Sequence, residues 1–228
     1  MVAEGTMTFR FEKPADFEFV AGQAGDWVLE HPTKTDKEGN KRSFTLSCAP
    51  YEDYLSFTTR LRETAFKENM QAMPFGSEIS FDGPWGELTL HEDVSVPAVF
   101  LTGGIGVTPA RSIVLQWAHD KLEHPMFLFY ANRRPEDAAY IDEMSAVAKA
   151  RSRFTFVPTM TEMENSKMSW TGERGHIDEA MLRRSLVDLN LPIYYLSGPP
   201  EMVEALQKML KGAGVKKDRV KTENFDGY

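Results

Sequence analysis

Three glycines within four residues follow a short apolar segment near the middle of the chain, where they are suited to binding a phosphate. The sequence there is Val99-Phe100-Leu101-Thr102-Gly103-Gly104-Ile105-Gly106-Val107-Thr108-Pro109, and apolar residues with helical spacing come after it. This order predicts a strand, a tight turn and a helix, with Thr108 as the N-cap and Pro109 in the first helical position. Glycines let backbone N–H groups approach a ligand, and a helix N-terminus attracts phosphate. The segment indicates either a pyrophosphate cradle or an ordinary strand–turn–helix corner, because Pro109 replaces the third glycine of G-x-G-x-x-G.

Two later turns also follow apolar segments and carry residues suited to an anionic cofactor. One turn is Asn132-Arg133-Arg134, and the other is Ser197-Gly198-Pro199-Pro200, which repeats the order of strand, glycine, proline and helix. In open α/β sheets, ligands bind beyond the carboxyl ends of the strands, where the strand order reverses. Two glycine turns favour a dinucleotide over a single phosphate. Either arginine could instead be a solvated turn residue.

Cations, hydroxyls and an aromatic ring also come together in the N-terminal half. In an extended strand, Arg42 and Phe44 share one face, while Ser43 and Thr45 share the other. Farther along, Thr64 is suited to capping a helix whose N-terminus receives phosphate, with Arg60 or Lys67 nearby. Both segments could equally carry charges that only keep the surface soluble.

The elements that position these residues change in kind along the chain. As far as about residue 92, short alternating or aromatic segments separated by turn residues predict a small antiparallel β-barrel with one short helix at 64–73. The expected strands there are 6–11, 17–20, 27–29, 44–46, 54–59, 78–81 and 88–90.

After Pro97, strands and helices alternate, which predicts a doubly wound parallel sheet covered on both faces. The expected strands are 99–101, 126–131, 154–157 and 193–196, and the expected helices are 109–119, 135–148, 177–185 and 200–210. The polar connection at 159–172 is a candidate mobile loop. We therefore divide the chain into domains at 1–94 and 95–228.

Composition narrows the class of protein. The 228 residues carry a formal charge of −8, which argues against nucleic acid as a partner. No apolar run approaches membrane-spanning length, and the first ten residues lack a signal-peptide core, so we expect a cytoplasmic protein without membrane insertion. Cys48 is the single cysteine, so this chain cannot supply the thiolates of an iron–sulfur cluster.

The ordered combination of segments resembles the motifs of the ferredoxin–NADP⁺ reductase superfamily. In chain order these segments are Arg42-Ser43-Phe44-Thr45, Gly83-Pro84-Trp85-Gly86, Gly103 to Pro109, Tyr130 to Asp137, Ser197 to Pro200 and Glu223-Asn224-Phe225. The resemblance spans almost the whole chain. It implies an N-terminal flavin-binding antiparallel barrel followed by an NAD(P)-binding α/β domain.

The resemblance also implies roles for single residues. Arg42 would pair with the flavin pyrophosphate, Phe44 would pack on the isoalloxazine, and Thr45 would hydrogen-bond flavin N5. The segment Thr64-Ala65-Phe66 matches the cradle of the FAD phosphates, which favours FAD over FMN. The candidate catalytic residues are Thr45, Ser197, Glu223 and Phe225. The candidate cofactor-binding residues are Arg42, Ser43, Phe44, Thr45, Arg60, Thr64, Ala65, Phe66, Gly103, Gly104, Gly106, Val107, Thr108, Asn132, Arg133, Arg134, Ser197, Gly198, Pro199, Met202, Phe225 and Tyr228.

The sequence departs from the family pattern at two places. Plant-type reductases have a cysteine where this chain has Ser197. The chain continues after Phe225, so either Phe225 or Tyr228 is the ring that stacks on the flavin.

These features predict an FAD-dependent NAD(P)H oxidoreductase whose electrons leave to an external acceptor, either a ferredoxin- or flavodoxin-like protein or a small molecule. Two alternatives stay open: a flavin reductase that releases reduced flavin, and an electron-transfer subunit of an oxygenase or dehydrogenase complex. Arg133 and Arg134 favour NADPH over NADH, because paired guanidinium groups suit a 2′-phosphate. The sequence does not indicate an oligomeric state.

Overall fold

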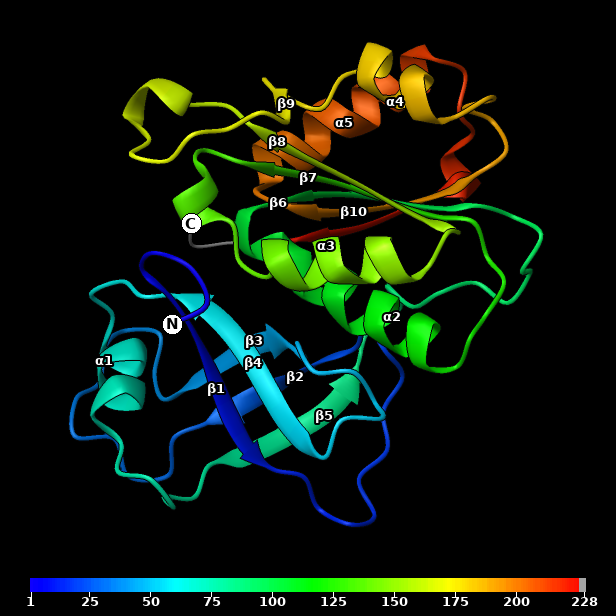
Figure 1. The fold of residues 1–228 in the computed structure, drawn as a ribbon. Coiled ribbons are helices and arrows are strands. Elements are labelled where there is room, and N and C mark those ends of the chain that lie inside the picture. The colour runs from blue at the N-terminus through cyan, green and yellow to red at the C-terminus, as the bar shows by residue number, and fades with distance from the viewer. Residues whose placement is uncertain (226–228) are drawn as a thin grey trace.

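The chain forms two adjoining parts, an antiparallel β part and an α/β part, as the computed structural model of residues 1–225 shows (Figure 1). The predicted fold class is confirmed. The candidate residue Tyr228 lies outside the described residues. No helix within residues 1–225 has the length and apolarity needed to cross a bilayer.

The antiparallel part consists of two small sheets with an aromatic core. Strand β1 (Thr6–Glu12) pairs with β4 (Tyr54–Arg60), and β2 (Ala24–Val28) lies between β3 (Lys41–Thr45) and β5 (Ser80–Trp85). Trp27, Phe57 and Phe66 are buried at the centre of this core. Phe66 comes from α1 (Ala65–Ala72), whose N-cap is Thr64, as the sequence predicts.

The α/β part is a six-stranded parallel sheet in the order β11-β10-β6-β7-β8-β9. Its strands are β6 (Ala98–Gly103), β7 (Met126–Asn132), β8 (Phe154–Met160), β9 (Glu173–Arg174), β10 (Ile193–Gly198) and β11 (Val220–Asn224). Helices α2 (Val107–His119) and α3 (Ile141–Ala150) cover one face, and α4 (Glu179–Ser185) and α5 (Pro200–Gly212) cover the other (Figure 1). Alternation along β6 fills both faces, since Phe100 packs on the α2 side while Val99 and Leu101 pack on the α5 side.

Several predicted boundaries are wrong for identifiable reasons. Helix α2 begins at Val107 and not at Pro109, because a 3₁₀ turn at Gly104–Gly106 runs directly into it. Thr108 is therefore not the N-cap, and its hydroxyl donates to the carbonyl of Ile105. Pro109 is the third helical residue, where the missing N–H still costs no helical hydrogen bond.

The predicted helix at 135–148 is divided. A 3₁₀ turn at Pro135–Asp137 comes first, and the left-handed Tyr140 (φ 62°) interrupts the chain before α3 begins. The segments at 17–20 and 88–90 are not strands, although Leu88 is buried from a loop. The sequence pattern does not predict β9 and β11, because polar edge strands contain no apolar run.

Candidate functional site

A pocket of about 390 Å³ lies where the carboxyl edge of the parallel sheet meets the antiparallel part. This volume falls in the range typical of small-molecule sites. Strands β3, β4 and β11 contribute to its walls, together with the turn between β6 and α2. Its lining residues are Ala24, Ser43, Phe44, Thr45, Thr58, Thr59, Arg60, Lys67, Trp85, Ile105, Thr108, Glu223, Asn224 and Phe225. A wider, open hollow at the β8–β9 edge contains none of the candidate residues. We therefore place the site in the 390 Å³ pocket.

Phe44 and Thr45 present a ring and a hydroxyl from neighbouring positions of β3. The Phe44 ring stacks on Phe57 with a centroid distance of 4.4 Å and an interplanar angle of 4°, which fixes its orientation. The Thr45 hydroxyl is buried, and within residues 1–225 it has no hydrogen-bond partner of good geometry. A buried hydroxyl of this kind is costly unless something binds it.

The C-terminal strand brings Glu223 and Phe225 into the same pocket. Parallel pairing sets Glu223 opposite Ser197 and Asn224 opposite Gly198, and the Phe225 N–H donates to the Gly198 carbonyl at 3.1 Å. Burial raises the pKa of Glu223 to about 7, and the nearby Thr45 hydroxyl opposes this shift. At neutral pH this carboxyl can therefore both hold and release a proton.

The raised pKa of Glu223 predicts a pH-dependent stability difference. The folded protein keeps the proton up to about pH 7, whereas the unfolded chain releases it near 4.5, so stability is lost as the pH rises through this window. Relative to Glu223→Gln, the flavin-free wild type is expected to lose on the order of 1–3 kcal/mol of unfolding free energy between pH 4.5 and 8. Urea unfolding at several pH values measures this difference, and a pH-independent gap between the two proteins would contradict the assignment.

The two glycine turns pack directly against each other. A Cβ on Gly106 would lie 2.3 Å from the carbonyl oxygen of Ser197, and one on Gly103 would lie 2.3 Å from the Met202 sulfur. The Ser197 hydroxyl donates to the Gly106 carbonyl at 2.7 Å. The glycines are therefore required for contact between the β6 and β10 strand ends, whatever else they bind.

Arg42, the predicted pyrophosphate residue, is already engaged within the antiparallel part. Its guanidinium donates to both carboxylate oxygens of Asp36, at 2.9 and 3.2 Å, and lies 3.1 Å from a Glu38 oxygen. Asp36 also accepts from the N–H of Ala65 at the first position of α1. An internal carboxylate thus occupies the anion-binding position that the sequence predicts for phosphate, and Arg42 does not line the pocket.

Arg60 and Lys67 are the cations that line the pocket. Within residues 1–225 neither side chain makes an ion pair or a hydrogen bond. Burial, together with the positive charges of Arg62 and Arg42, lowers the pKa of Lys67 to about 8. From the sequence, Lys67 was predicted only as a neighbour of Thr64, although its position as the third residue of the helix was a signal for it.

The β7 turn lies outside this pocket. Asn132 is buried, and neither polar atom of its side chain makes a hydrogen bond of good geometry within residues 1–225. Arg133 is exposed, with Glu162 at 3.5 Å, while Arg134 donates to Asp137 at 2.8 and 2.9 Å. Of these two arginines, Arg133 is the one more accessible to a ligand.

The comparisons with known proteins agree with this architecture. A family model described as the oxidoreductase NAD-binding domain matches residues 100–208, in the part that contains both glycine turns. The related sequences and solved structures support the resemblance of the chain to the ferredoxin–NADP⁺ reductase superfamily. Among solved structures, the FAD/NAD-binding domain of a Vibrio cholerae nitric oxide dioxygenase gives a TM-score of 0.83 at 17% identity, covering 99% of this chain and 94% of that one. A Neisseria gonorrhoeae ferredoxin–NADP⁺ reductase with bound FAD and NADP gives 0.78 at 21%, covering 96% and 92%.

The related sequences are also reductase components. The reductase component of Rhodococcus jostii propane 2-monooxygenase is 28% identical, over 93% of this chain and 57% of its own length. One component of the Na⁺-translocating NADH-quinone reductase of Shewanella denitrificans is 26% identical, over 94% of this chain and 57% of its own length. The chain thus spans less than two thirds of the length of these relatives.

The pocket fits the flavin that this superfamily implies. The buried Thr45 hydroxyl lacks a hydrogen bond of good geometry within residues 1–225, the fixed Phe44 ring is suited to a flat heteroaromatic system, and the two unpaired cations suit phosphate. The family resemblance and the pocket together support the use of a flavin and a nicotinamide cofactor by this chain. The role of each single residue stays a prediction.

Proposed function

We propose that this chain is an FAD-dependent NAD(P)H oxidoreductase that passes electrons to an external acceptor. The observation that supports this most strongly is one pocket, in which β3 of the antiparallel part faces β11 and the glycine turn of the NAD-binding part. We propose residues 1–94 as the flavin-binding domain and 95–228 as the NAD(P)-binding domain. When bound, the flavin accepts a hydride from the nicotinamide and passes the electrons on.

The residues of the chain bind the two cofactors, orient them and exclude water from between them. Phe44 supports one ring face, and the Thr45 hydroxyl supplies a hydrogen bond at the edge of that ring. Phe225, held by the Gly198 carbonyl, closes the pocket from the β11 side and would give way to the nicotinamide. Glu223, with a pKa of about 7, holds or releases a proton beside Thr45.

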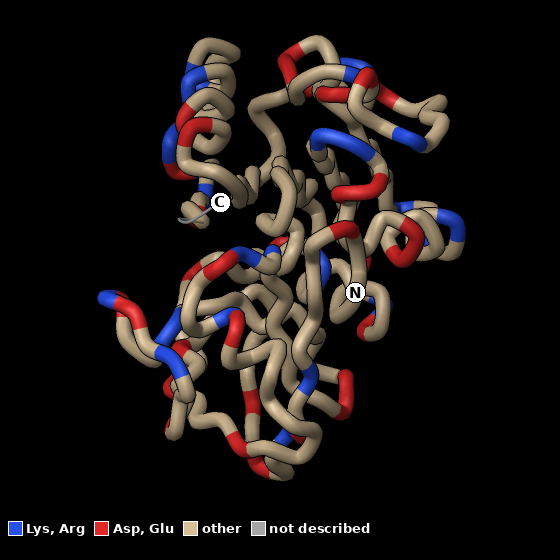
Figure 2. The backbone as a smooth tube through the Cα atoms, turned by 90° about the vertical axis from the view of Figure 1, so that its left-hand side faces the viewer, with Lys and Arg blue, Asp and Glu red and all other residues tan. Residues whose placement is uncertain are grey.

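The relatives suggest which electron acceptor and which larger assembly this chain serves. Several relatives are reductase or electron-transfer components of monooxygenases. This favours, as the second candidate, an electron-transfer subunit of a larger oxygenase system. In Figure 2, basic and acidic positions are interspersed over both parts of the chain, and Lys34 and Lys41 pair with Glu68 and Asp26. Charge alone therefore gives little steering toward an acidic carrier.

Purification separates the candidate functions. A yellow protein that keeps FAD through gel filtration and reduces ferricyanide supports the oxidoreductase. Protein that is active only with added flavin indicates a flavin reductase. FAD-loaded protein that reduces nothing without a partner protein indicates the electron-transfer subunit.

We also propose NADPH as the preferred co-substrate, with Arg133 contacting the 2′-phosphate. Arg133→Ala is expected to raise the KM for NADPH by roughly 10-fold, the loss of one charge-assisted contact, and to leave the KM for NADH unchanged. Arg134→Ala is expected to have a smaller effect, because Asp137 already holds that guanidinium. A wild-type enzyme that prefers NADH would contradict the preference, but not the flavin chemistry.

A further inference from the structure

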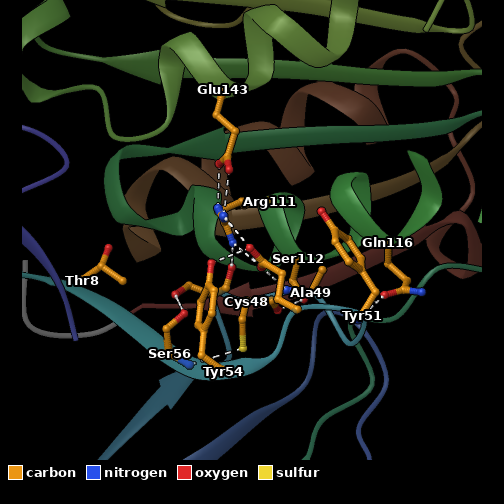
Figure 3. Close-up of polar contacts among 12 residues, drawn as sticks. Thr8, Cys48, Ala49, Tyr51, Tyr54, Ser56, Arg111, Ser112, Gln116 and Glu143 are labelled. Carbon is orange, nitrogen blue, oxygen red and sulfur yellow. Dashed lines mark hydrogen bonds and ion pairs between the residues drawn. The ribbon is translucent and has the colours of Figure 1, made fainter. Parts of the chain in front are cut away.

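A buried arginine joins the two parts of the molecule. Arg111, on α2, is 4% exposed and donates to Glu143 at 2.7 and 2.8 Å and to Glu52 at 3.0 Å. Figure 3 shows the contacts between Arg111 and Glu143. It also donates to the carbonyl of Ser47. The Tyr140 ring lies 4.8 Å from the guanidinium carbon. All three guanidinium nitrogens are thus engaged.

The partners of Arg111 come from different parts of the fold. Ser47 and Glu52 lie in the connection between β3 and β4 of the antiparallel part, whereas Glu143 lies on α3 beside α2. Two further α2 residues bind the same connection: Ser112 donates to the Cys48 carbonyl at 2.6 Å, and Gln116 accepts from the Tyr51 N–H at 3.0 Å (Figure 3). Helix α2 is therefore hydrogen-bonded to residues 47–52 at three of its positions, Arg111, Ser112 and Gln116.

Both sides of the link between Arg111 and residues 47–52 lie close in sequence to residues of the candidate site. On one side, Ser47 is two residues beyond Thr45, which lines the pocket. On the other side, Arg111 is one helical turn beyond Val107, where α2 leaves the glycine turn. The link between Arg111 and residues 47–52 thus joins the strand that supports the flavin to the turn assigned to the nucleotide.

A charge is an expensive way to join two surfaces. Removing a guanidinium and carboxylates from water costs free energy that their attraction only partly returns, and packed apolar residues would serve stability equally well. The network instead fixes the relative orientation of the two parts, because several hydrogen bonds to one planar guanidinium group allow only one arrangement of its partners.

We propose that Arg111 is a positioning residue: through Glu52 and Ser47 it sets the placement of the nucleotide turn relative to the flavin strand β3. The proposal rests on the proposed function. Hydride transfer depends steeply on this placement, since a displacement of about 1 Å can cost on the order of 100-fold in rate.

Two isosteric variants separate positioning from simple support of the helix. Glu52→Gln weakens the link between the two parts, whereas Glu143→Gln removes one carboxylate charge from the same guanidinium but weakens only the contact between α2 and α3. Arg111→Lys is the third variant, because lysine keeps the charge and loses the planar fork.

The first measurement is hydrogen exchange of the Ala49 and Tyr51 amides in the flavin-free protein. The Tyr51 amide donates to Gln116 of α2 and so reports on the contact between the two parts. The Ala49 amide donates to Glu52 within residues 47–52 and so reports on the order of that connection. Glu52→Gln and Arg111→Lys are expected to speed their exchange by about 10-fold or more, the factor that follows loss of one charge-assisted hydrogen bond. Glu143→Gln is expected to leave it near the wild-type rate.

The second measurement is anaerobic reduction of bound FAD at saturating NAD(P)H, well below each variant's melting temperature. Glu52→Gln and Arg111→Lys are expected to slow reduction by roughly 10- to 100-fold and to weaken the charge-transfer absorbance, while FAD affinity stays within about 2-fold. Equal losses in Glu52→Gln and Glu143→Gln, or wild-type exchange and reduction in all three variants, would overturn the proposal. A wild type that no nicotinamide reduces would instead overturn the proposed function, and the exchange data would still test the link.

Discussion

Alanine at Lys67 is expected to weaken FAD binding by about 10- to 100-fold, because this ammonium lies in the pocket without an internal partner. Arg60→Ala is expected to act in the same direction, since Arg60 also lines the pocket unpaired. Arg42→Ala is expected to have a smaller effect, because Asp36 and Glu38 already hold its guanidinium. Equilibrium titration of flavin-free protein with FAD measures all three affinities.

Lys67 also predicts a pH dependence of this binding. Its pKa of about 8 means that the ammonium loses its charge as the pH rises through that value, so FAD affinity is expected to fall between pH 7 and pH 9. In Lys67→Ala this fall should disappear.

The exposed Arg62 gives a matched control for Lys67, because it carries the same charge nearby but does not line the pocket. If Arg42→Ala releases FAD as fully as Lys67→Ala, then Arg42 contacts the phosphates and Asp36 must give way to them. Tighter binding by Asp36→Asn would point to the same conclusion, since Asp36 would then compete with the ligand.

Gly106→Ala is expected to destabilise the protein by about 1–3 kcal/mol, the usual cost of forcing extra volume into a packed site. The added Cβ would lie 2.3 Å from the Ser197 carbonyl oxygen and 2.7 Å from the Gly198 Cα, and backbone atoms cannot rotate away. The two glycine turns would have to separate, so NAD(P)H binding is expected to weaken together with stability.

The melting temperature and the dissociation constant for NADP⁺ measure this effect. Gly212→Ala is the control, because it adds the same methyl group at the end of α5, where no atom lies within 4 Å. A Gly106→Ala protein that melts and binds like the control would show that the contact between the turns does not matter.

Local pattern predicted the order of the elements better than their boundaries. The buried run at Val99 to Leu101 and the glycines after it are a strong signal, because this strand lies at the centre of the sheet. Strand β11 gave no such signal, since Val220–Asn224 is a polar edge strand. Helix α2 begins two residues before its predicted start, because a glycine turn can continue directly into a helix without a side-chain cap.

The site depended on information that spacing alone does not contain. Thr45 and Glu223 line the same pocket because β11 pairs beside β10, and only the resemblance to a family suggested that neighbourhood. Asp36 comes from a loop, so nothing in the pattern indicated that it would bind Arg42. Arg111 follows helical spacing on an apolar face, and a charge at such a position was the one available signal of a buried network.

Anaerobic mixing of the FAD-loaded chain with NADPH tests the central claim most directly. We expect the visible absorbance of the oxidised flavin to disappear at a rate that saturates with NADPH, because we propose that both cofactors meet in the pocket between β3, β11 and the glycine turn. We also expect ferricyanide then to restore this absorbance. If neither NADPH nor NADH bleaches a bound flavin that dithionite does bleach, the pocket does not join the two cofactors and the proposed function is wrong.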